Sequence, residues 1–371
     1  MKWKALSPAH TQVYKAIAIL MIVIHNFMHW LPGPKEMEFS YSPNFFFYFI
    51  SSTINEPEKA IQFTFSFIGH FGVQVFIFLS AYGLTKKYLK KQPSYTAFIL
   101  SRARLIYPPF IIAILFWAFL KADYSFGILA PFKTIYWNLE SIILKLTLLS
   151  NFIESERLSV VGPWWFISFI FQIYFIFPVL FYCNKRFGSQ SLIIITVLSY
   201  ALLILSNGVI GNVGLLFTVI GHLPEICIGI YLATRDYKDI SISNYIVIAS
   251  FGAFILGNIN SSVWFLTHAS FLILLLSLLQ LGHNYLIKGK ANKALRAIGA
   301  ISMQLFLVNG FLRQPFVDLA KVHDDWIISL LYGLLSLSIS VLVAIALLKA
   351  ERVYKTCSDY FLKQPKPKSS N

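Results

Sequence analysis

The sequence has few charged residues and few cysteines. Asp, Glu, Lys and Arg make up 13% of its 371 residues, whereas a soluble domain usually carries about 25%. The three cysteines (Cys183, Cys227 and Cys357) are scattered without the spacing of metal ligands, so we expect neither a disulfide framework nor a metal site. A glycine-rich phosphate loop and a repeat of solenoid period are also lacking. These absences exclude a typical soluble enzyme and a disulfide-stabilised secreted domain.

Apolar runs of membrane-spanning length recur along the whole chain. Hydrophobic residues make up 57% of the sequence, and the mean hydropathy is +0.66. Because a bilayer core about 30 Å thick requires roughly 20 apolar residues per helix, we predict an all-α polytopic membrane protein of about ten transmembrane helices. The predicted spans are residues 14–32, 65–85, 103–120, 163–183, 190–207, 212–233, 243–259, 263–282, 295–313 and 327–349.

The distribution of basic residues predicts the orientation. The chain has 31 Lys and Arg against 16 Asp and Glu, and most of the basic residues fall at alternate ends of the spans. An excess of Lys and Arg marks cytoplasmic loops, so both termini are predicted in the cytoplasm, and the bilayer rather than nucleic acid is the partner of this charge. We interpret residues 136–152 as an amphipathic segment on the outer surface, because an additional span there would reverse every later loop.

The chain divides into a membrane domain and a tail. We assign residues 1–350 to one transmembrane domain and residues 351–371 to a basic cytoplasmic tail, which we expect to be disordered near anionic headgroups. The outer loops, 33–64 and 121–162, contain acidic and aromatic residues. They either cap an outward-facing cavity or simply connect spans.

Polar residues inside apolar spans are costly and mark candidate sites. His25 lies about 16 Å into the first span at 1.5 Å per residue, near the bilayer midplane, where an imidazole can take a proton from an attacking hydroxyl. Gln74 in the second span is predicted at a similar depth and is a candidate to orient that imidazole. Glu225 is the only acid well inside an apolar span, and it needs a partner such as His222. For each of them the alternative is a hydrogen bond that only joins helices.

Basic residues gather at the cytoplasmic ends of the first three spans. Arg102 and Arg104 lie on the span side of their loop, and Lys15 begins the first span on the same side. Guanidinium groups bind phosphates through paired hydrogen bonds, so this cluster suits a polyphosphorylated ligand such as coenzyme A. The alternative is plain anchoring of the span ends at lipid headgroups.

These stretches also carry a resemblance to a known family, the acyltransferase 3 family of integral-membrane O-acyltransferases. The resembling stretches, which follow the family's order, are Lys15-AIAILMIVI-His25, Gly72-VQVF, Arg102-ARLIY-Pro108, Trp164-WFIS, LPEICIGIYLA around Glu225, IGAISMQLFLVN ending at Asn309, and Glu351. The chain departs from the family pattern at Gln74, Leu105, Ile170 and Asn309, and it has Lys15 where the family has Arg.

The resemblance implies an O-acetyltransferase of the bacterial cytoplasmic (inner) membrane that modifies an envelope polysaccharide. It implies acetyl-CoA, or another acyl-CoA, as co-substrate, no bound cofactor, and a hydroxyl of an envelope glycan or lipid-linked sugar as acceptor. Together with the residue chemistry, it assigns catalysis to His25, Gln74 and Glu225, donor binding to Arg102, Arg104 and Lys15, and acceptor binding to Trp164, Trp165 and Tyr174.

Two other classes remain open. A secondary transporter or flippase for a glycan or an acidic solute would use His25 and Glu225 as a proton relay, although the sequence shows neither an inverted repeat nor a Pro/Gly-broken helix pair. A non-catalytic partner in envelope assembly would not need His25. Covalent label transferred from acetyl-CoA distinguishes the enzyme from the transporter.

Overall fold

Helices make up nearly all of the regular structure. The structure is a computed structural model that describes residues 6–235, 243–323 and 325–363. Within these ranges β1 (Val209–Ile210) and β2 (Val213–Gly214) form one small antiparallel hairpin. The helices are α1 (Pro8–Met28), α2 (Pro43–Asn55), α3 (Ala60–Ile68), α4 (Gly72–Tyr88), α5 (Tyr95–Lys121), α6 (Ala130–Trp137), α7 (Leu139–Leu146), α8 (Trp165–Phe187), α9 (Ser189–Leu205), α10 (Leu223–Thr234), α11 (Asn244–Ile259), α12 (Leu266–Leu281), α13 (His283–Lys288), α14 (Asn292–Ala300), α15 (Ser302–Leu312), α16 (Gln314–His323) and α17 (Trp326–Lys363). The predicted all-α class is confirmed.

Several helices are suited to a membrane. In the described ranges, 5 helical stretches are long and apolar enough to cross one, and α14 with α15 makes a further span if the pair, bent by 74°, counts as one. Four shorter apolar helices lie where the sequence predicts spans: Ser189–Leu205, Val219–Thr234, Asn244–Ile259 and Leu266–Leu281. A helix satisfies its own backbone hydrogen bonds, which lipid cannot do. The chain is a multi-pass membrane protein, while the count of ten spans and the orientation stay predictions.

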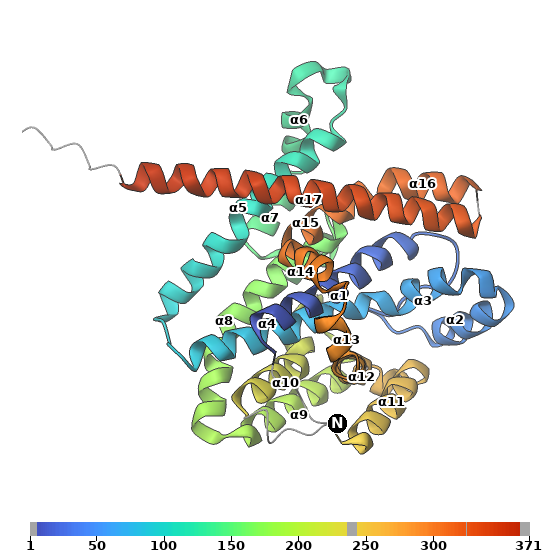
Figure 1. Ribbon diagram of the computed structural model, residues 1–371, viewed down its shortest axis with the longest axis vertical. Coiled ribbons are helices and arrows are strands. Elements are labelled where there is room, and N and C mark those ends of the chain that lie inside the picture. Colours follow the sequence, from blue (N-terminus) through green and yellow to red (C-terminus); the bar gives the residue numbers. More distant parts are fainter. Residues whose placement is uncertain (1–5, 236–242, 324, 364–371) are drawn as a thin grey trace, which may run out of the picture.

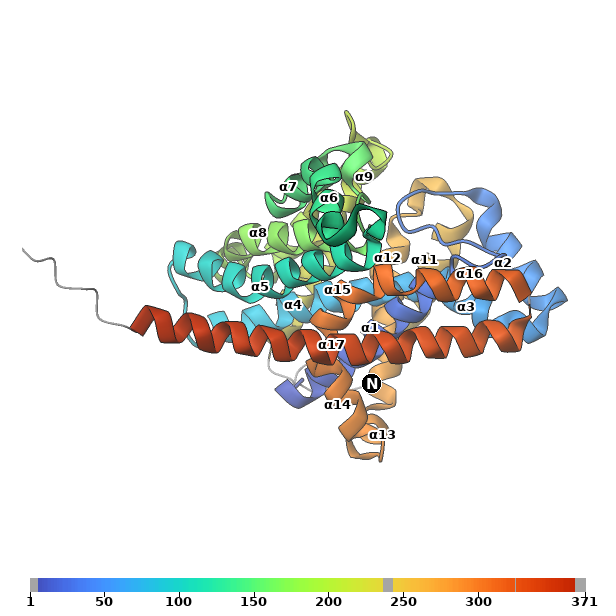
Figure 2. The same cartoon turned by 90° about the horizontal axis from the view of Figure 1, so that it is seen from above.

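Helix α1 lies at the centre of the bundle. Its first turn is capped by Ser7, whose hydroxyl accepts from the His10 amide at 3.2 Å while the His10 ring accepts from the Ser7 amide, so the helix begins at Pro8 with its orphan amide groups satisfied. Helices α3, α4, α14, α15 and α17 all pack on α1. Figure 1 shows α17 and α9 on opposite sides of the bundle, with α1 and α4 between them, and Figure 2 shows α17 running along the length of the bundle.

The second predicted span is interrupted where it crosses α1. A 3₁₀ turn, Gly69–Phe71, joins α3 to α4. The backbones touch here because the residues are glycines: a Cβ on Gly69 would lie 2.6 Å from the Cβ of His25, and one on Gly72 would lie 2.5 Å from the carbonyl oxygen of Ala18. This contact fixes the level of His25 against the second span.

We expect Gly69→Ala to destabilise the protein. The added methyl has no room against His25 and the Met21 carbonyl, and overpacking of this kind typically costs about 1–3 kcal/mol. The measurement is thermal unfolding of the purified protein in detergent. Gly83→Ala is the matched control, because a Cβ there meets nothing within 4 Å and alanine favours the helix. Equal melting temperatures of the two variants would contradict the close packing at Gly69.

Helix α17 is longer than a bilayer requires. Its 38 residues span about 57 Å at 1.5 Å per residue, against a hydrocarbon core of about 30 Å. The helix passes position 350, where the sequence predicts a disordered tail, and continues to Lys363. Glu351 accepts a hydrogen bond from Gln304 at 2.8 Å and pairs with Lys355 one turn later, which favours continued helix. Residues 364–371 of the predicted tail lie outside the described residues.

The segment that we interpret as surface-lying, residues 136–152, begins in the last turn of α6 and contains α7 and a 3₁₀ turn at Ser150–Phe152. Helices α6 and α7 have 8 residues each, too few to cross a bilayer. Lys145 of α7 is buried and donates to the carbonyl oxygens of Glu156 and Arg157 at 2.9 and 2.7 Å. Burial lowers the pKa of Lys145 to about 8. This lysine therefore ties the following loop to α7.

Candidate active site

A basic cavity opens at one end of α1, α4 and α5. It has a volume of about 610 Å³, within the range of about 300–1,000 Å³ usual for small-molecule sites. The basic residues that line it are Lys15, Lys86, Lys87, Lys90 and Arg102, and none of its lining residues within the described chain is acidic. We call the side of the molecule on which this cavity opens the basic end. Such a cavity suits a ligand with several phosphates.

The basic cavity continues into a second cavity inside the bundle, which we call the inner cavity. The inner cavity has a volume of about 420 Å³, and Lys15, Ser80, Leu105 and Tyr174 line both. Its far end is apolar and reaches Ile22. A charged mouth thus leads to a chamber in the core of the bundle whose lining is mostly apolar but includes Gln304 and Glu351. The chamber ends one helical turn before His25.

His25 is held in a defined orientation beyond the inner cavity. Its Nδ1 lies 3.1 Å from the carbonyl oxygen of Phe65 in α3, so Nδ1 carries the proton and donates it. Nε2 is then left with its lone pair, the state of a general base. The His70 ring from the 3₁₀ turn lies 5.6 Å from the His25 ring, centroid to centroid. We call the region around His25 and His70 the histidine end.

The loop after α1 folds back over the histidine end. Gly33 turns the chain with φ +129°, and Gln62 and Ser66 of α3 donate to the carbonyl oxygens of Pro32 and Pro34 at 2.7 and 2.5 Å. The loop thereby brings Glu36 to 2.9 Å from Nδ1 of His29. Burial opposes ionisation of Glu36, but the hydrogen bond from His29 together with the charges of His25 and His29 outweighs it and holds the pKa of Glu36 below its ordinary value. This loop therefore packs over the histidine end.

A second buried polar group lies between α4, α10 and α12. Nδ1 of His222 is 3.8 Å from a carboxylate oxygen of Glu225, and the His222 ring lies 5.6 Å from that of His268. Helix α10 packs on α4 where Gly229 approaches the Phe78 carbonyl. His268 also contacts Phe71, at the start of α4, so α10 and α4 run in the same direction from this level.

The predicted catalytic set divides between these two places. Gln74 and Glu225 each precede the α4–α10 contact by one turn, so they lie at one level between those helices, both fully buried. His25 lies level with Gly69 instead, about 8 Å from Gln74 along the second span. The predicted neighbour of Glu225, His222, lies beside it, whereas the predicted equal depth of Gln74 and His25 does not fit the structure. The reason is that the 3₁₀ turn, rather than α4, crosses α1 at His25.

The predicted donor residues also separate. Lys15 and Arg102 both line the basic cavity, and the Arg102 guanidinium lies over the rings of Phe98 and Tyr174 at 5.5 and 5.8 Å. Arg104 is exposed and lies outside the lining of both cavities. Because one helical turn is 3.6 residues, two side chains that are two positions apart on α5 lie on different faces of the helix.

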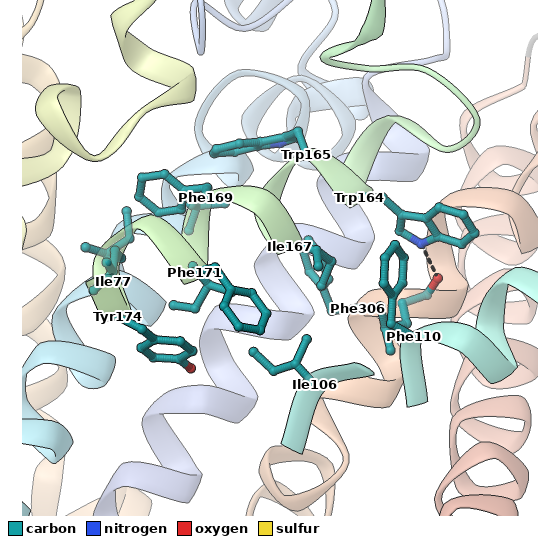
Figure 3. Packing of buried hydrophobic residues seen from close by; sticks show 14 of the residues in the cluster. Ile77, Ile106, Phe110, Trp164, Trp165, Ile167, Phe169, Phe171, Tyr174 and Phe306 are labelled. Carbon is teal, nitrogen blue, oxygen red and sulfur yellow. Dashed lines mark hydrogen bonds between the residues drawn. The ribbon is translucent and has the colours of Figure 1, made fainter. Parts of the chain in front are cut away.

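The predicted acceptor residues lie in the interior. Trp164 is fully buried and donates its indole N–H to the Leu307 carbonyl at 2.9 Å (Figure 3). Trp165 is also buried and contacts Phe217. Tyr174 lines the basic and inner cavities, as Lys15 does. Of the three aromatic residues, the structure thus buries Trp164 and Trp165 in the core and places Tyr174 at the basic end.

The positions at which the chain departs from the family pattern lie among the residues of the cavities and of the buried polar groups. Leu105 and Ile170 line the inner cavity and contribute apolar side chains to it. Asn309 accepts a hydrogen bond from Asn26 at 2.7 Å. Asn26 follows His25 in α1, so this pair joins α15 to α1 beside the candidate base.

Sequence reasoning did not single out three residues of the histidine end. His70 and Glu36 come from the second span and the first outer loop, and Arg313 follows α15. Nε and Nη1 of Arg313 are buried without a hydrogen-bond partner among the described residues, and its charge acts on His25 and Glu36. The signal for His70 was present, because it is an ionisable residue inside a predicted span. Arg313 gives a similar signal, because it ends the predicted span 295–313, whereas Glu36 lies in a loop and gives none.

A comparison with family models agrees with this architecture. A model described as an acyltransferase domain, that of the acyltransferase 3 family, matches residues 12–349, which include the histidine end and most of the residues that line the two cavities. Comparisons with curated proteins and with solved structures give no match.

Proposed function

The chain belongs to the acyltransferase 3 family of membrane acyltransferases, and we propose that it moves an acetyl group from acetyl-CoA to a hydroxyl of an envelope glycan or lipid-linked sugar. The observation that carries the proposal is the continuous path from the basic cavity through the inner cavity to within one turn of His25. Acyl-CoA is a cytoplasmic metabolite, so the proposal places the basic end in the cytoplasm, as the positive-inside rule predicts. We assign the protein to the bacterial cytoplasmic membrane.

The cavities suit the two chemically different parts of the donor. Arg102 and Lys15 bind its phosphates, since both line the basic cavity. The pantetheine arm, which carries amide groups on an apolar chain, enters the inner cavity. There Gln304 has a buried amide oxygen without a partner among the described residues, which accepts a hydrogen bond from a pantetheine amide.

The reaction at the thioester uses the free nitrogen of His25. Nε2 takes the proton of the acceptor hydroxyl as the hydroxyl oxygen attacks the thioester carbonyl. The carbon–sulfur bond then breaks, the coenzyme A thiolate leaves, and it receives the proton from His25. The products are the ester and free coenzyme A, and histidine returns to its starting state. The Phe65 carbonyl keeps the imidazole in the required tautomer throughout.

Gln74 and Glu225 support the reaction at a distance in this proposal. Both lie outside the lining of the two cavities, so we assign them to positioning α4 against α10. Trp164 holds α8 to α15 through its bond to Leu307. Tyr174 supports Arg102 at the donor site.

One observation favours a transporter instead. The bend of 74° between α14 and α15 is a broken helix of the kind that many transporters use, and the sequence shows no sign of it. The bend lies beside the inner cavity, which Ala300 and Ser302 line. In an enzyme the same bend opens room for the donor.

Acetyl-CoA labelled in the acetyl group tests the proposal. Membrane vesicles with the basic end outward are expected to transfer label to an endogenous glycan or lipid-linked sugar, and vesicles without the protein are not. The measurement is label in the polymer or lipid fraction, with mass analysis of the added group. Uptake of a solute without covalent label would favour the transporter.

A further inference from the structure

We propose that His25, His29 and Glu36 form a binding site for a divalent transition-metal ion, Zn²⁺ by preference, at the histidine end. Each residue offers one ligand atom, and these three atoms lie within 4.8 Å of one another. The set consists of two imidazoles and one carboxylate, which zinc accepts with a fourth position left for water. The sequence predicts no metal site, because its cysteines lack metal spacing and Glu36 lies outside the span.

The two histidines are placed by one helix. His25 lies in the last turn of α1, and His29 caps the helix four residues later. The two side chains therefore lie on the same face, and their ring centroids are 5.1 Å apart. This is the spacing by which a helix presents two histidines to one zinc ion. Tetrahedral zinc with bonds of about 2.0–2.2 Å places two ligand atoms about 3.4 Å apart, so side chains of the observed cluster must move closer by up to about 1.4 Å to bind it.

The third ligand is positioned by the loop after α1. The bonds of Gln62 and Ser66 to Pro32 and Pro34 hold the turn that carries Glu36. Glu36 and His29 already lie 2.9 Å apart, and a metal ion takes the place of the proton that bridges them. Their side chains are 18% and 24% exposed, so a cation reaches the site from outside the bundle although His25 is buried.

The surroundings of His25 also resemble those of a metal ligand. A ligating histidine usually donates its other ring N–H to a carbonyl or carboxylate, which fixes the ring and its tautomer. The Nδ1–H of His25 makes that contact with Phe65. The free Nε2 therefore suits a metal ion as well as a proton.

The neighbouring charges make the site one of moderate affinity. Glu36 supplies one negative charge, while Arg313 and Lys35 bring positive charge close to it. Lys35 is partly engaged by the carbonyl oxygens of His29 and Leu31. These cations oppose a bound Zn²⁺, so we infer reversible occupancy rather than a permanent structural ion.

Reversible occupancy regulates the reaction. This step rests on the proposed function: a metal ion on Nε2 of His25 occupies the lone pair that takes the hydroxyl proton. Zn²⁺ added at the histidine end therefore inhibits acyl transfer, and a chelator restores it. Binding itself does not depend on the proposed function.

The direct test measures binding of Zn²⁺ alone to the purified, untagged full chain in detergent, by calorimetry and by competition with the visible absorption of bound Co²⁺. We expect one site per chain, and at least a tenfold loss of affinity in His29→Ala and in Glu36→Gln. His323→Ala is the matched control, because His323 lies on α16 and stacks on Tyr332 outside the cluster. Absence of binding by the unchanged protein, or binding that survives both ligand substitutions, overturns the proposal.

Arg313→Gln is expected to change the affinity for Zn²⁺ in the opposite direction to the ligand substitutions. Removing this positive charge is expected to tighten Zn²⁺ binding several-fold, whereas damage to the fold would weaken it. Size-exclusion chromatography and melting temperature show whether each variant is folded. If Zn²⁺ binds but no acyl transfer is found under any condition, the metal site stands and the proposed function fails. If the protein transfers acyl groups, binds no Zn²⁺ and is not inhibited by Zn²⁺, the proposed function stands and the metal site fails.

Discussion

Replacing His25 by glutamine is expected to lower acyl transfer by roughly 10²- to 10⁴-fold, the usual contribution of a general base. Glutamine can still donate a hydrogen bond to the Phe65 carbonyl, as Nδ1 of His25 does, and it fills most of the space beside Gly69. It cannot take a proton from a hydroxyl. The variant therefore separates the chemistry of the imidazole from its packing, which His25→Ala does not. The measurement is the rate of label transfer from acetyl-CoA, normalised to protein in the membrane.

His323→Gln is the control for this experiment. It makes the same substitution on α16, at a histidine that contacts Tyr332 rather than the cavities, and it is expected to keep the rate of the unchanged protein. Full activity in His25→Gln, at an equal amount of folded protein, would rule out His25 as the base. Loss of activity in both variants would point to a general loss of folded protein instead.

Replacing Arg102 by alanine is expected to weaken acyl-CoA binding by roughly tenfold to a hundredfold. The guanidinium lies in the lining of the basic cavity, and a hydrogen bond to a charged group contributes about 1.5–3 kcal/mol. The effect should appear in the KM for acyl-CoA and in its dissociation constant. It should fall as the ionic strength rises, because salt screens the mouth of the cavity.

Arg104→Ala is the matched control for Arg102→Ala. The two arginines are two positions apart on α5 and have the same chemistry, but Arg104 is exposed and outside the cavity lining. Sequence reasoning gives both the same role, whereas the structure gives it to Arg102. We expect Arg104→Ala to bind acyl-CoA almost as tightly as the unchanged protein. A larger loss in Arg104→Ala than in Arg102→Ala would show that the donor enters by another face of α5.

The clustering of basic residues at one end of the bundle was largely predictable from sequence. Lys15 and Arg102 had to lie near the same face of the membrane, because charge at span ends follows the orientation of the chain. The structure confirms that they share one cavity. Which of Arg102 and Arg104 enters that cavity depends on the rotation of α5 about its axis, and an apolar pattern on all sides of a helix leaves that rotation undetermined.

The histidine end was predictable only for His25. An imidazole in an apolar run is conspicuous, and its depth follows from helix rise. Its neighbours are not conspicuous, since Glu36 comes from a loop and reaches His29 through a turn at Gly33. The misplaced level of Gln74 has the same origin. Counting residues assumes one continuous helix, while the second span contains a 3₁₀ turn.

The sequence by itself determined the class of this protein: a chain of apolar runs with basic ends, in an order that resembles one acyltransferase family. Those features are local, because burial in lipid and headgroup charge act on each segment separately. Only the tertiary structure decided which polar groups meet. Contacts such as that of Glu36 with His29, of His25 with Phe65 and of Arg102 with the basic cavity depend on helix rotation, on glycine-sized gaps and on a folded-back loop, and these arise only when the segments pack together.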